Sequence, residues 1–269
     1  MLKIAHAANI STRTVKTESG NELELKYFDY KSTGFSPSET DLKKDCIVSG
    51  EYEGGLELWE GNVCLIKHLL DTQSQYSNSE DLRVLDVGCG QGQAGAILLS
   101  AGAQVTFQDF NKNVISDITP LCVNANLETW QSSSSNKKAH YIYGDWEELT
   151  KECSGEEIDR YDLILTADTV YNKSYYQKLY EYIRINLKES GTCLCSCQAY
   201  YYGCGGGEQE YIDFSDKFNE FDITKLQEFE DNNSIKRCVL GIKWKPESYT
   251  TSKEVPPPQE AETENFLSF

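Results

Sequence analysis

The stretch Val84-Leu-Asp-Val-Gly-Cys-Gly-Gln-Gly92 decides the fold class of this chain. An apolar run from Arg83 to Val87 passes through an acidic residue into alternating glycines, and small and apolar residues follow from Gln93 to Ala101. Glycines let the backbone turn tightly and approach a ligand, and the start of a helix offers unpaired N–H groups. We therefore expect a strand, a ligand-binding turn and a helix.

Strands and helices continue to alternate on the C-terminal side of this turn. The expected strands cover residues 103–107, 139–143, 161–166 and 192–199. The expected helices cover residues 111–127 and 174–187, and Gly191 is expected to end the second. This alternation predicts an α/β fold with a mostly parallel sheet and right-handed crossovers. Residues 221–229 and 235–244 predict an antiparallel C-terminal hairpin.

Composition divides the 269 residues into three parts. Residues 1–50 are polar and weakly patterned, and we expect only a short strand at 23–28 and a loop over 31–49. Residues 51–245 carry the alternating pattern, which predicts a single domain. Residues 246–269 are rich in proline and acidic residues, which predicts a disordered acidic tail.

The formal net charge of −18 argues against a general nucleic-acid binder, because phosphates require a basic face, and it permits a basic protein partner. No run of about 18 apolar residues exists, so we expect no membrane span. The first residues lack the apolar core of a signal peptide. The ten cysteines then fit reduced thiols in the cytoplasm, with the nucleus as a second location. Cys193, Cys195 and Cys197 would share one strand face, which predicts core packing and no metal site.

Two cofactor classes compete for the glycine-rich turn. The run Gly90-Gln-Gly-Gln-Ala-Gly95 satisfies the dinucleotide pattern GxGxxG, and Asp109 follows at the distance of a ribose-binding acid. Asp86 favours the other class, because its carboxylate would repel a pyrophosphate and attract a cation. S-adenosylmethionine carries an amino group and a sulfonium and has no phosphate. Asp109 would then hold the ribose, and Asp145 would accept from the adenine amino group beside Trp146.

Three further motifs narrow this interpretation. Tyr52-Glu-Gly-Gly55 precedes the first strand of the expected domain, Gln108-Asp-Phe-Asn111 ends the second, and the triple glycine Gly205 to Gly207 follows the fifth. With the glycine-rich turn they resemble the seven-strand, Rossmann-like methyltransferases. More narrowly, they resemble the histidine protein methyltransferases that modify a large-subunit ribosomal protein. The resemblance covers roughly residues 45–245, and Tyr200 departs from it because the family commonly has a histidine there.

This resemblance implies a protein-L-histidine N-methyltransferase that uses S-adenosyl-L-methionine. It implies a basic, ribosomal protein as substrate, a monomeric enzyme, and neither nucleic acid nor membrane as a direct partner. Together with the carboxylates above, it also implies which residues bind the cofactor. They are Trp59, Glu60, Asp86, Gly88, Gly90, Gln108, Asp109, Phe110, Gly144, Asp145, Trp146 and Thr166.

The chemistry at the acceptor end indicates two catalytic candidates. An imidazole with a pKa of about 6.5 is mostly neutral at pH 7 and can attack a methyl group directly. It then has to lose its other proton, which a carboxylate in the pocket would accept. Asp168, after the fourth strand, is the candidate carboxylate, and Tyr171 would form the pocket wall with its ring face toward the cation. Alternatively, Asp168 caps the next helix and Tyr171 packs in the core.

Three other functions remain open. A lysine-directed protein methyltransferase has the same fold and a similar acidic-x-x-Tyr stretch. A small-molecule methyltransferase would need a tighter pocket, whereas Gly203 to Gly207 predict an open, mobile groove. A non-catalytic scaffold that keeps the cofactor fold is the third, and the presence of Asp86, Asp109 and Asp145 together speaks against it.

Overall fold

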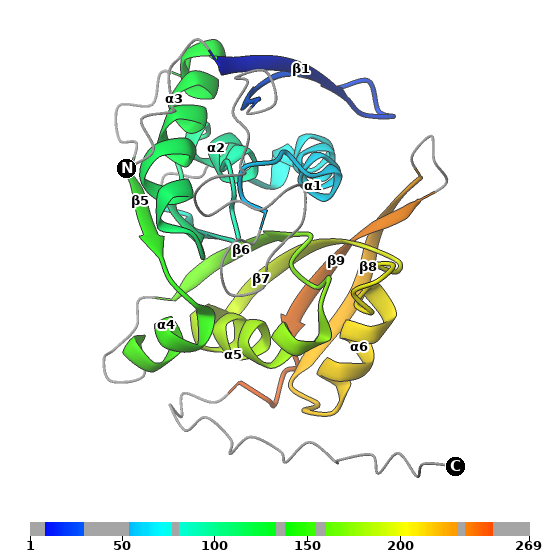
Figure 1. Cartoon of the computed structure of the whole chain (residues 1–269). Coiled ribbons are helices and arrows are strands. Elements are labelled where there is room, and N and C mark those ends of the chain that lie inside the picture. Colours follow the sequence, from blue (N-terminus) through cyan, green and yellow to red (C-terminus); the bar gives the residue numbers. More distant parts are fainter. Residues whose placement is uncertain are drawn as a thin grey trace.

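The computed structural model describes residues 9–29, 54–76, 81–132, 138–153, 160–230 and 235–249. Its centre is a seven-stranded sheet with helices on both faces (Figure 1). The strands lie in the order β5-β4-β3-β6-β7-β9-β8. Their bounds are β3 Arg83–Val87, β4 Gln104–Asp109, β5 Lys138–Tyr143, β6 Tyr161–Ala167, β7 Leu187–Gln198, β8 Phe221–Glu230 and β9 Lys236–Trp244. This order confirms the expected seven-strand α/β fold.

The strands β3 to β7 run parallel, and the C-terminal hairpin runs against them. β9 pairs antiparallel with both β7 and β8, which confirms the predicted hairpin. The order in which strands are added to the sheet reverses at β3: β4 and β5 lie on one side of it, and β6 and β7 lie on the other. In open α/β sheets such a switch point leaves a crevice outside the carboxyl ends of the strands, and ligands bind there.

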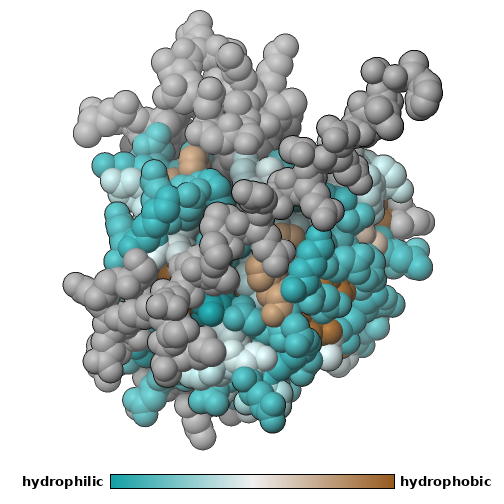
Figure 2. All heavy atoms as spheres, turned by 90° about the horizontal axis from the view of Figure 1, so that it is seen from below, coloured by the Kyte–Doolittle hydropathy of each residue, from teal (hydrophilic) through white to brown (hydrophobic). Residues whose placement is uncertain are grey.

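Helices cover the sheet in two layers. α1 (Glu60–Asp71), α2 (Gln93–Ser100) and α3 (Thr119–Thr129) lie on one face, and α4 (Trp146–Cys153), α5 (Tyr176–Asn186) and α6 (Glu208–Asp216) lie on the other (Figure 1). Each layer has its own apolar core, with Leu98 and Phe107 in the first and Tyr180 and Tyr211 in the second. Figure 2 shows mainly hydrophilic residues and small apolar areas on the described part of the second layer's surface.

A separate two-stranded sheet lies next to the first layer. It consists of β1 (Ile10–Lys16) and β2 (Glu22–Phe28), which pair antiparallel. The Asn126 side chain accepts from Lys26 N at 2.7 Å and donates to Lys26 O at 2.8 Å, so α3 holds β2 by its backbone. The sequence predicted the second strand and missed the first.

The element bounds differ from prediction in two places. Gly191 does not end a helix, because α5 ends at Asn186 and the chain is already extended at Leu187, where β7 begins. The expected helix over 111–127 is helical from residue 112, but it contains a π-helical segment, Val114–Ile118, directly before α3, where Pro120 occupies the first turn and has no N–H to donate. The expected loop over 31–49 and most of the expected tail, from residue 250, lie outside the described residues.

The predicted core packing of three cysteines agrees with the structure. Cys193, Cys195 and Cys197 are fully buried in the second apolar core. Among the described residues no His, Cys, Asp or Glu side chains form a metal-binding group. In the same part of the chain, no helix has the length and apolar character needed to cross a membrane.

Gly95 tests the packing of α2 on the sheet. A Cβ there would lie 2.5 Å from Phe107 Cε1 and 2.8 Å from Asp86 Oδ2. Helix propensity alone predicts that Gly95→Ala stabilises the protein by about 1 kcal/mol. We expect the opposite, a loss of about 1–3 kcal/mol in the free energy of unfolding, because the buried ring cannot move away.

Urea denaturation measures this difference in the free energy of unfolding. The control is Glu152→Ala on the exposed side of α4, for which we expect a change within about 0.5 kcal/mol. A Gly95→Ala protein more stable than the parent would contradict this account of the packing.

Candidate active site

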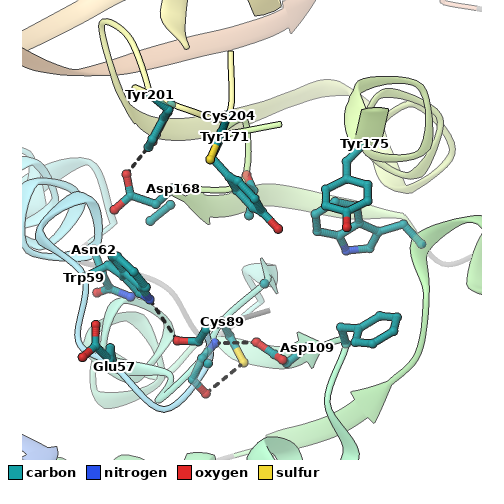
Figure 3. Close-up of a pocket in the computed structure, with 18 of the residues that line it drawn as sticks. Glu57, Trp59, Asn62, Cys89, Asp109, Asp168, Tyr171, Tyr175, Tyr201 and Cys204 are labelled. Carbon is teal, nitrogen blue, oxygen red and sulfur yellow. Dashed lines mark hydrogen bonds between the residues drawn. The ribbon is translucent and has the colours of Figure 1, made fainter. Parts of the chain in front are cut away.

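A cavity of about 560 Å³ opens where the carboxyl ends of β3, β4 and β6 meet the start of α1. Ten of the fourteen residues predicted for the site line it. They are Trp59, Gly88, Gly90, Asp109, Phe110, Gly144, Asp145, Trp146, Asp168 and Tyr171. Figure 3 shows Asp168 and Tyr171 on one side of the cavity and Asp109 on the other.

The glycine-rich turn is held by two side chains from the end of β4. Gly88 and Gly90 have φ values of 61° and 52°, in the left-handed region that favours glycine. Gly88 N donates to Gln108 Oε1 at 3.2 Å, and Gly90 N donates to Asp109 Oδ2 at 3.0 Å. The glycine-rich turn and the end of β4 are therefore joined by these two hydrogen bonds at the floor of the cavity.

Gln108 organises the cavity without lining it. Its Oε1 also accepts from Trp146 Nε1 at 2.9 Å, and its Nε2 donates to Gly144 O at 3.0 Å. The side chain is fully buried. We expected Gln108 to contact the cofactor, and the structure instead places it behind the wall, where it fixes Gly88, Gly144 and Trp146.

Three other predicted residues also lie away from the cavity. Glu60 forms a two-pronged ion pair with Arg13 of β1, at 2.7 and 2.9 Å. Thr166 donates to Val87 O at 3.0 Å, inside the sheet. Asp86 is 2% exposed and its Oδ2 accepts from Gly95 N at 3.0 Å, because its side chain points toward the start of α2 and not over the turn. None of the three therefore lines the cavity as expected.

Asp145 has a partner that sequence reasoning missed. Both of its carboxylate oxygens lie within 3.2 Å of Lys178 Nζ, and Oδ1 also accepts from Glu147 N at 2.8 Å. Lys178 comes from α5 and lines the cavity as well. No motif marks it in the sequence, and only the packing of α4 on α5 brings it here.

Asp168 is an enclosed charged group at the other side of the cavity from Asp109. Its φ of 54° is unusual for a residue other than glycine, and its side chain is only 9% exposed. Oδ2 accepts from Gly61 N at 2.9 Å, and Oδ1 accepts from the Tyr201 hydroxyl at 2.5 Å and from Arg237 Nη1 at 3.3 Å. Burial raises the pKa of this carboxyl, while Tyr201, Arg237 and the Gly61 N–H oppose that rise.

Asp168 caps a helix, although not the next one in the chain. Gly61 lies in the first turn of α1, so its N–H belongs to a helix N-terminus, which favours an anion. A Cβ at Gly61 would overlap the Asp168 carboxylate, so this approach requires glycine. The short helix after β6 is capped by Asn172, whose side chain accepts from Ser174 N at 3.0 Å.

Tyr171 and the loop after β7 form the wall beside Asp168. The Tyr171 ring packs edge-on against Tyr175 and Tyr201, with ring centroids 5.8 and 6.4 Å apart. Gly206 N donates to Tyr171 O at 3.0 Å, and a Cβ at Gly206 would lie 2.5 Å from that oxygen. We expected the glycines of this loop to make an open groove, whereas Gly206 allows the loop to dock closely.

One unsatisfied side chain faces the same space. Asn62 of α1 lines the cavity next to Trp59 (Figure 3). Its Oδ1 is buried and has no hydrogen-bond partner within the described part of the chain. Unpaired buried amides are costly, which points to a missing ligand group at this position.

The placement of Asp86 predicts a pH dependence of stability. Burial is the main cause that raises its pKa to about 7, whereas an unfolded aspartate has a pKa of about 3.9. The folded state therefore binds the extra proton, and stability should fall as pH rises from about 4 to about 7. Asp86→Asn should reduce this pH dependence, because an amide does not titrate. The reduction is on the order of 2–4 kcal/mol at most in the free energy of unfolding, summed over this pH range. The amide oxygen can still accept from Gly95 N, so the local structure is kept.

The free energy of unfolding, measured from pH 4.5 to 8, tests this expectation. Asp222→Asn, on the exposed side of β8, is the control and should leave the slope as it is. Parallel curves for the parent and Asp86→Asn would mean that Asp86 stays charged in the folded protein.

Comparisons with known proteins agree with this geometry. Residues 45–213 match the family model described as lysine methyltransferase. A histidine protein methyltransferase 1 homolog of Dictyostelium discoideum is 34% identical over 201 residues, 75% of this chain and 61% of the relative. The homolog of Mus musculus is 31% identical over 254 residues, 87% of this chain and 67% of the relative.

One solved structure illustrates the shared fold. The 1,6-didemethyltoxoflavin-N1-methyltransferase of Burkholderia thailandensis has a TM-score of 0.51 at 15% identity and covers 71% of this chain and 82% of its own. The chain thus spans about three fifths of the Dictyostelium relative and matches the family model over most of its own length. It belongs to the lysine methyltransferase family, together with relatives named histidine protein methyltransferase 1 homologs.

Proposed function

We propose that this chain transfers a methyl group from S-adenosylmethionine to a ring nitrogen of a histidine in a basic protein, a large-subunit ribosomal protein. The observation that carries the proposal is a single cavity with Asp109 and Trp146 at one end and the buried Asp168 with Tyr171 at the other. The relatives named histidine protein methyltransferase 1 homologs support histidine as the acceptor. The net charge of −18 supports a basic partner.

The residues of the cavity fit S-adenosylmethionine. The volume of about 560 Å³ lies within the range of small-molecule sites. The carboxylates Asp109 and Asp145 suit a nucleoside, and the one lysine that lines the cavity within the described residues, Lys178, is paired with Asp145 and so has less charge to offer the pyrophosphate of NAD. The unsatisfied amide of Asn62 suits the amino acid part of the cofactor, which carries both a donor and an acceptor.

Each end of the cavity has its own task. Asp109 would bind the ribose hydroxyls, and Asp145 the adenine amino group, with the Trp146 ring held beside the base by Gln108. When bound, the cofactor supplies a methyl group on a positively charged sulfur. Tyr171 lines the cavity near Asp168, where its ring would favour that cation.

Asp168 is suited to orient and deprotonate an imidazole. A neutral imidazole attacks through its free ring nitrogen, a nitrogen–carbon bond forms as the carbon–sulfur bond breaks, and the other ring N–H must then release its proton. Asp168 carries three donors on about four acceptor positions, so one position on Oδ2 remains for the substrate N–H. Its raised pKa moves it toward that of imidazole, which favours proton transfer.

Lysine is the second candidate acceptor, and the description of the family model favours it. A lysine ammonium with a pKa of about 10.4 must lose a proton before it attacks, whereas imidazole need not. The acidic cavity would hold a lysine in its charged, unreactive form. We therefore place histidine first.

The ribose assignment predicts the effect of Asp109→Asn on cofactor binding. Loss of the charged acceptor should weaken S-adenosylhomocysteine binding by about 1.5–3 kcal/mol, the typical value of a hydrogen bond to a charged group. Isothermal titration calorimetry measures this loss, with Asp222→Asn as the control, and NAD should not bind either protein. Tight NAD binding, or an unchanged affinity in Asp109→Asn, would contradict the cofactor assignment.

The acceptor assignment predicts the modified amino acid. We expect label from methyl-labelled S-adenosylmethionine, incubated with the enzyme and large-subunit ribosomal proteins, to appear as methylhistidine after acid hydrolysis. Asp168→Asn should lower kcat by about 10²–10⁴-fold, because an amide cannot accept the proton. Its affinity for S-adenosylhomocysteine serves as the check on folding. Recovery of methyllysine would reject histidine as the acceptor.

A further inference from the structure

Tyr201 makes the shortest contact to the Asp168 carboxylate, although it is not among the residues predicted for the site. Its hydroxyl donates to Asp168 Oδ1 at 2.5 Å and accepts from Gln198 N at 3.1 Å (Figure 3). Only 9% of the residue is exposed. Burial and the neighbouring carboxylate raise the pKa of this phenol well above its ordinary value, so it remains a donor throughout the working pH range.

The backbone fixes the direction of this hydroxyl. Tyr201 N donates to Gly206 O at 2.9 Å, and Gly206 N donates to Tyr171 O at 3.0 Å. Asn172 and Gly205 also pair as an antiparallel bridge. The loop after β7, which carries the phenol, is thus attached by its backbone to the segment after β6, which carries Asp168 itself.

The two oxygens of Asp168 have different surroundings. Within the part of the chain that the structure describes, Oδ1 accepts from both Tyr201 and Arg237, and Oδ2 accepts only from Gly61 N. Arg237 is 8% exposed and comes from β9, which is paired on both sides, with β7 and with β8. Both acceptor positions on Oδ1 are therefore taken, and the open position lies on Oδ2.

We propose that Tyr201 is a positioning residue for the transfer: its hydroxyl holds Oδ1 of Asp168, which leaves Oδ2 as the oxygen that receives the proton of the substrate N–H. This inference rests on the proposed function, because it assumes that Asp168 accepts that proton. Tyr201 itself does not contact the reacting atoms. It acts on the Asp168 carboxylate, which it keeps charged and whose orientation it holds through Oδ1.

Other groups around Asp168 determine what a pH experiment reports. The titratable and charged groups that face it are Tyr201 from the loop after β7, Arg237 from β9, Glu60 and Cys64 from α1, and Cys195 and Cys197 from β7. Glu60 is paired with Arg13. Only Tyr201 and Arg237 among these donate a hydrogen bond to the carboxylate, so they are the groups that favour its charged form.

Tyr201→Phe isolates the hydroxyl with little change in shape. Without this donor, less opposes the effect of burial, so the pKa of Asp168 rises. As the pH is lowered, the carboxylate is then protonated at a higher pH than in the parent. The acid limb of kcat should move to higher pH, with a loss of about tenfold or more at its acid end, the factor that a hydrogen bond to a charged group supplies. Above the limb, kcat should stay within about threefold of the parent, because charged Asp168 is then restored.

A second readout needs no substrate. Carbon-13 NMR of the aspartate carboxyls, with the Asp168 signal assigned by its absence in Asp168→Asn, should show a higher titration midpoint in Tyr201→Phe. Arg237→Lys keeps the charge but loses the planar fork and should move the midpoint in the same direction by a smaller amount. Tyr200→Phe removes a hydroxyl one residue away, on a side chain that is 45% exposed, and is the matched control.

The outcomes separate this inference from the proposed function. A higher Asp168 midpoint together with a displaced acid limb, both absent in Tyr200→Phe, supports the inference. Methylhistidine formation by Tyr201→Phe with the parent pH profile and the parent midpoint overturns it and leaves the proposed function standing. An equal loss of kcat at every pH also overturns it, because a merely structural role gives that result. Methyllysine as the product overturns the proposed function, while the NMR midpoint still tests the Tyr201–Asp168 bond.

Discussion

The burial of the Asp168 carboxylate is the constraint on which the site depends. A charge removed from water loses several kcal/mol of solvation, and only well-placed donors offset that loss. Here the donors come from three separate places: the N-terminus of α1, the loop after β7 and the antiparallel strand β9. The buried carboxylate is therefore satisfied only where all three segments are packed around it.

At the proposed cofactor end of the cavity, the uncharged side chain of Gln108 likewise joins several segments. A buried amide left unpaired costs about 1–3 kcal/mol, and this one is satisfied by the glycine turn, Gly144 and Trp146. The conformation of the turn and the orientation of the indole are thereby linked through one side chain. Each half of the cavity is organised by a polar residue near a strand end. Asp168 lines the cavity, and Gln108 lies behind its wall.

The sequence predicted the sheet well because its strands are short apolar runs separated by glycines and polar turns. Asp109, Asp145 and Asp168 line one cavity, since the carboxyl ends of parallel strands meet at one edge, and their roles there stay predictions. Sequence reasoning missed Gly61, Tyr201 and Arg237, which lie 107, 33 and 69 residues from Asp168 and meet it only through packing. Asp86 does not line the cavity, because side chains alternate across a strand and the pattern does not tell which neighbour lies on each side.

The two-stranded sheet of β1 and β2, here called the N-terminal hairpin, also helps to position the residues around the cavity. Gln91, at the cavity wall within the glycine turn, accepts from Phe28 N at 2.9 Å and donates to Phe28 O at 3.0 Å and to Leu56 O at 2.8 Å. One side chain therefore joins β2, the turn and the segment that leads to Trp59. Because Arg13 of β1 also pairs with Glu60 at the start of α1, the hairpin holds both sides of that segment. Residues outside the Rossmann-like sheet thus set the position of α1, and with it the Gly61 N–H that stabilises Asp168.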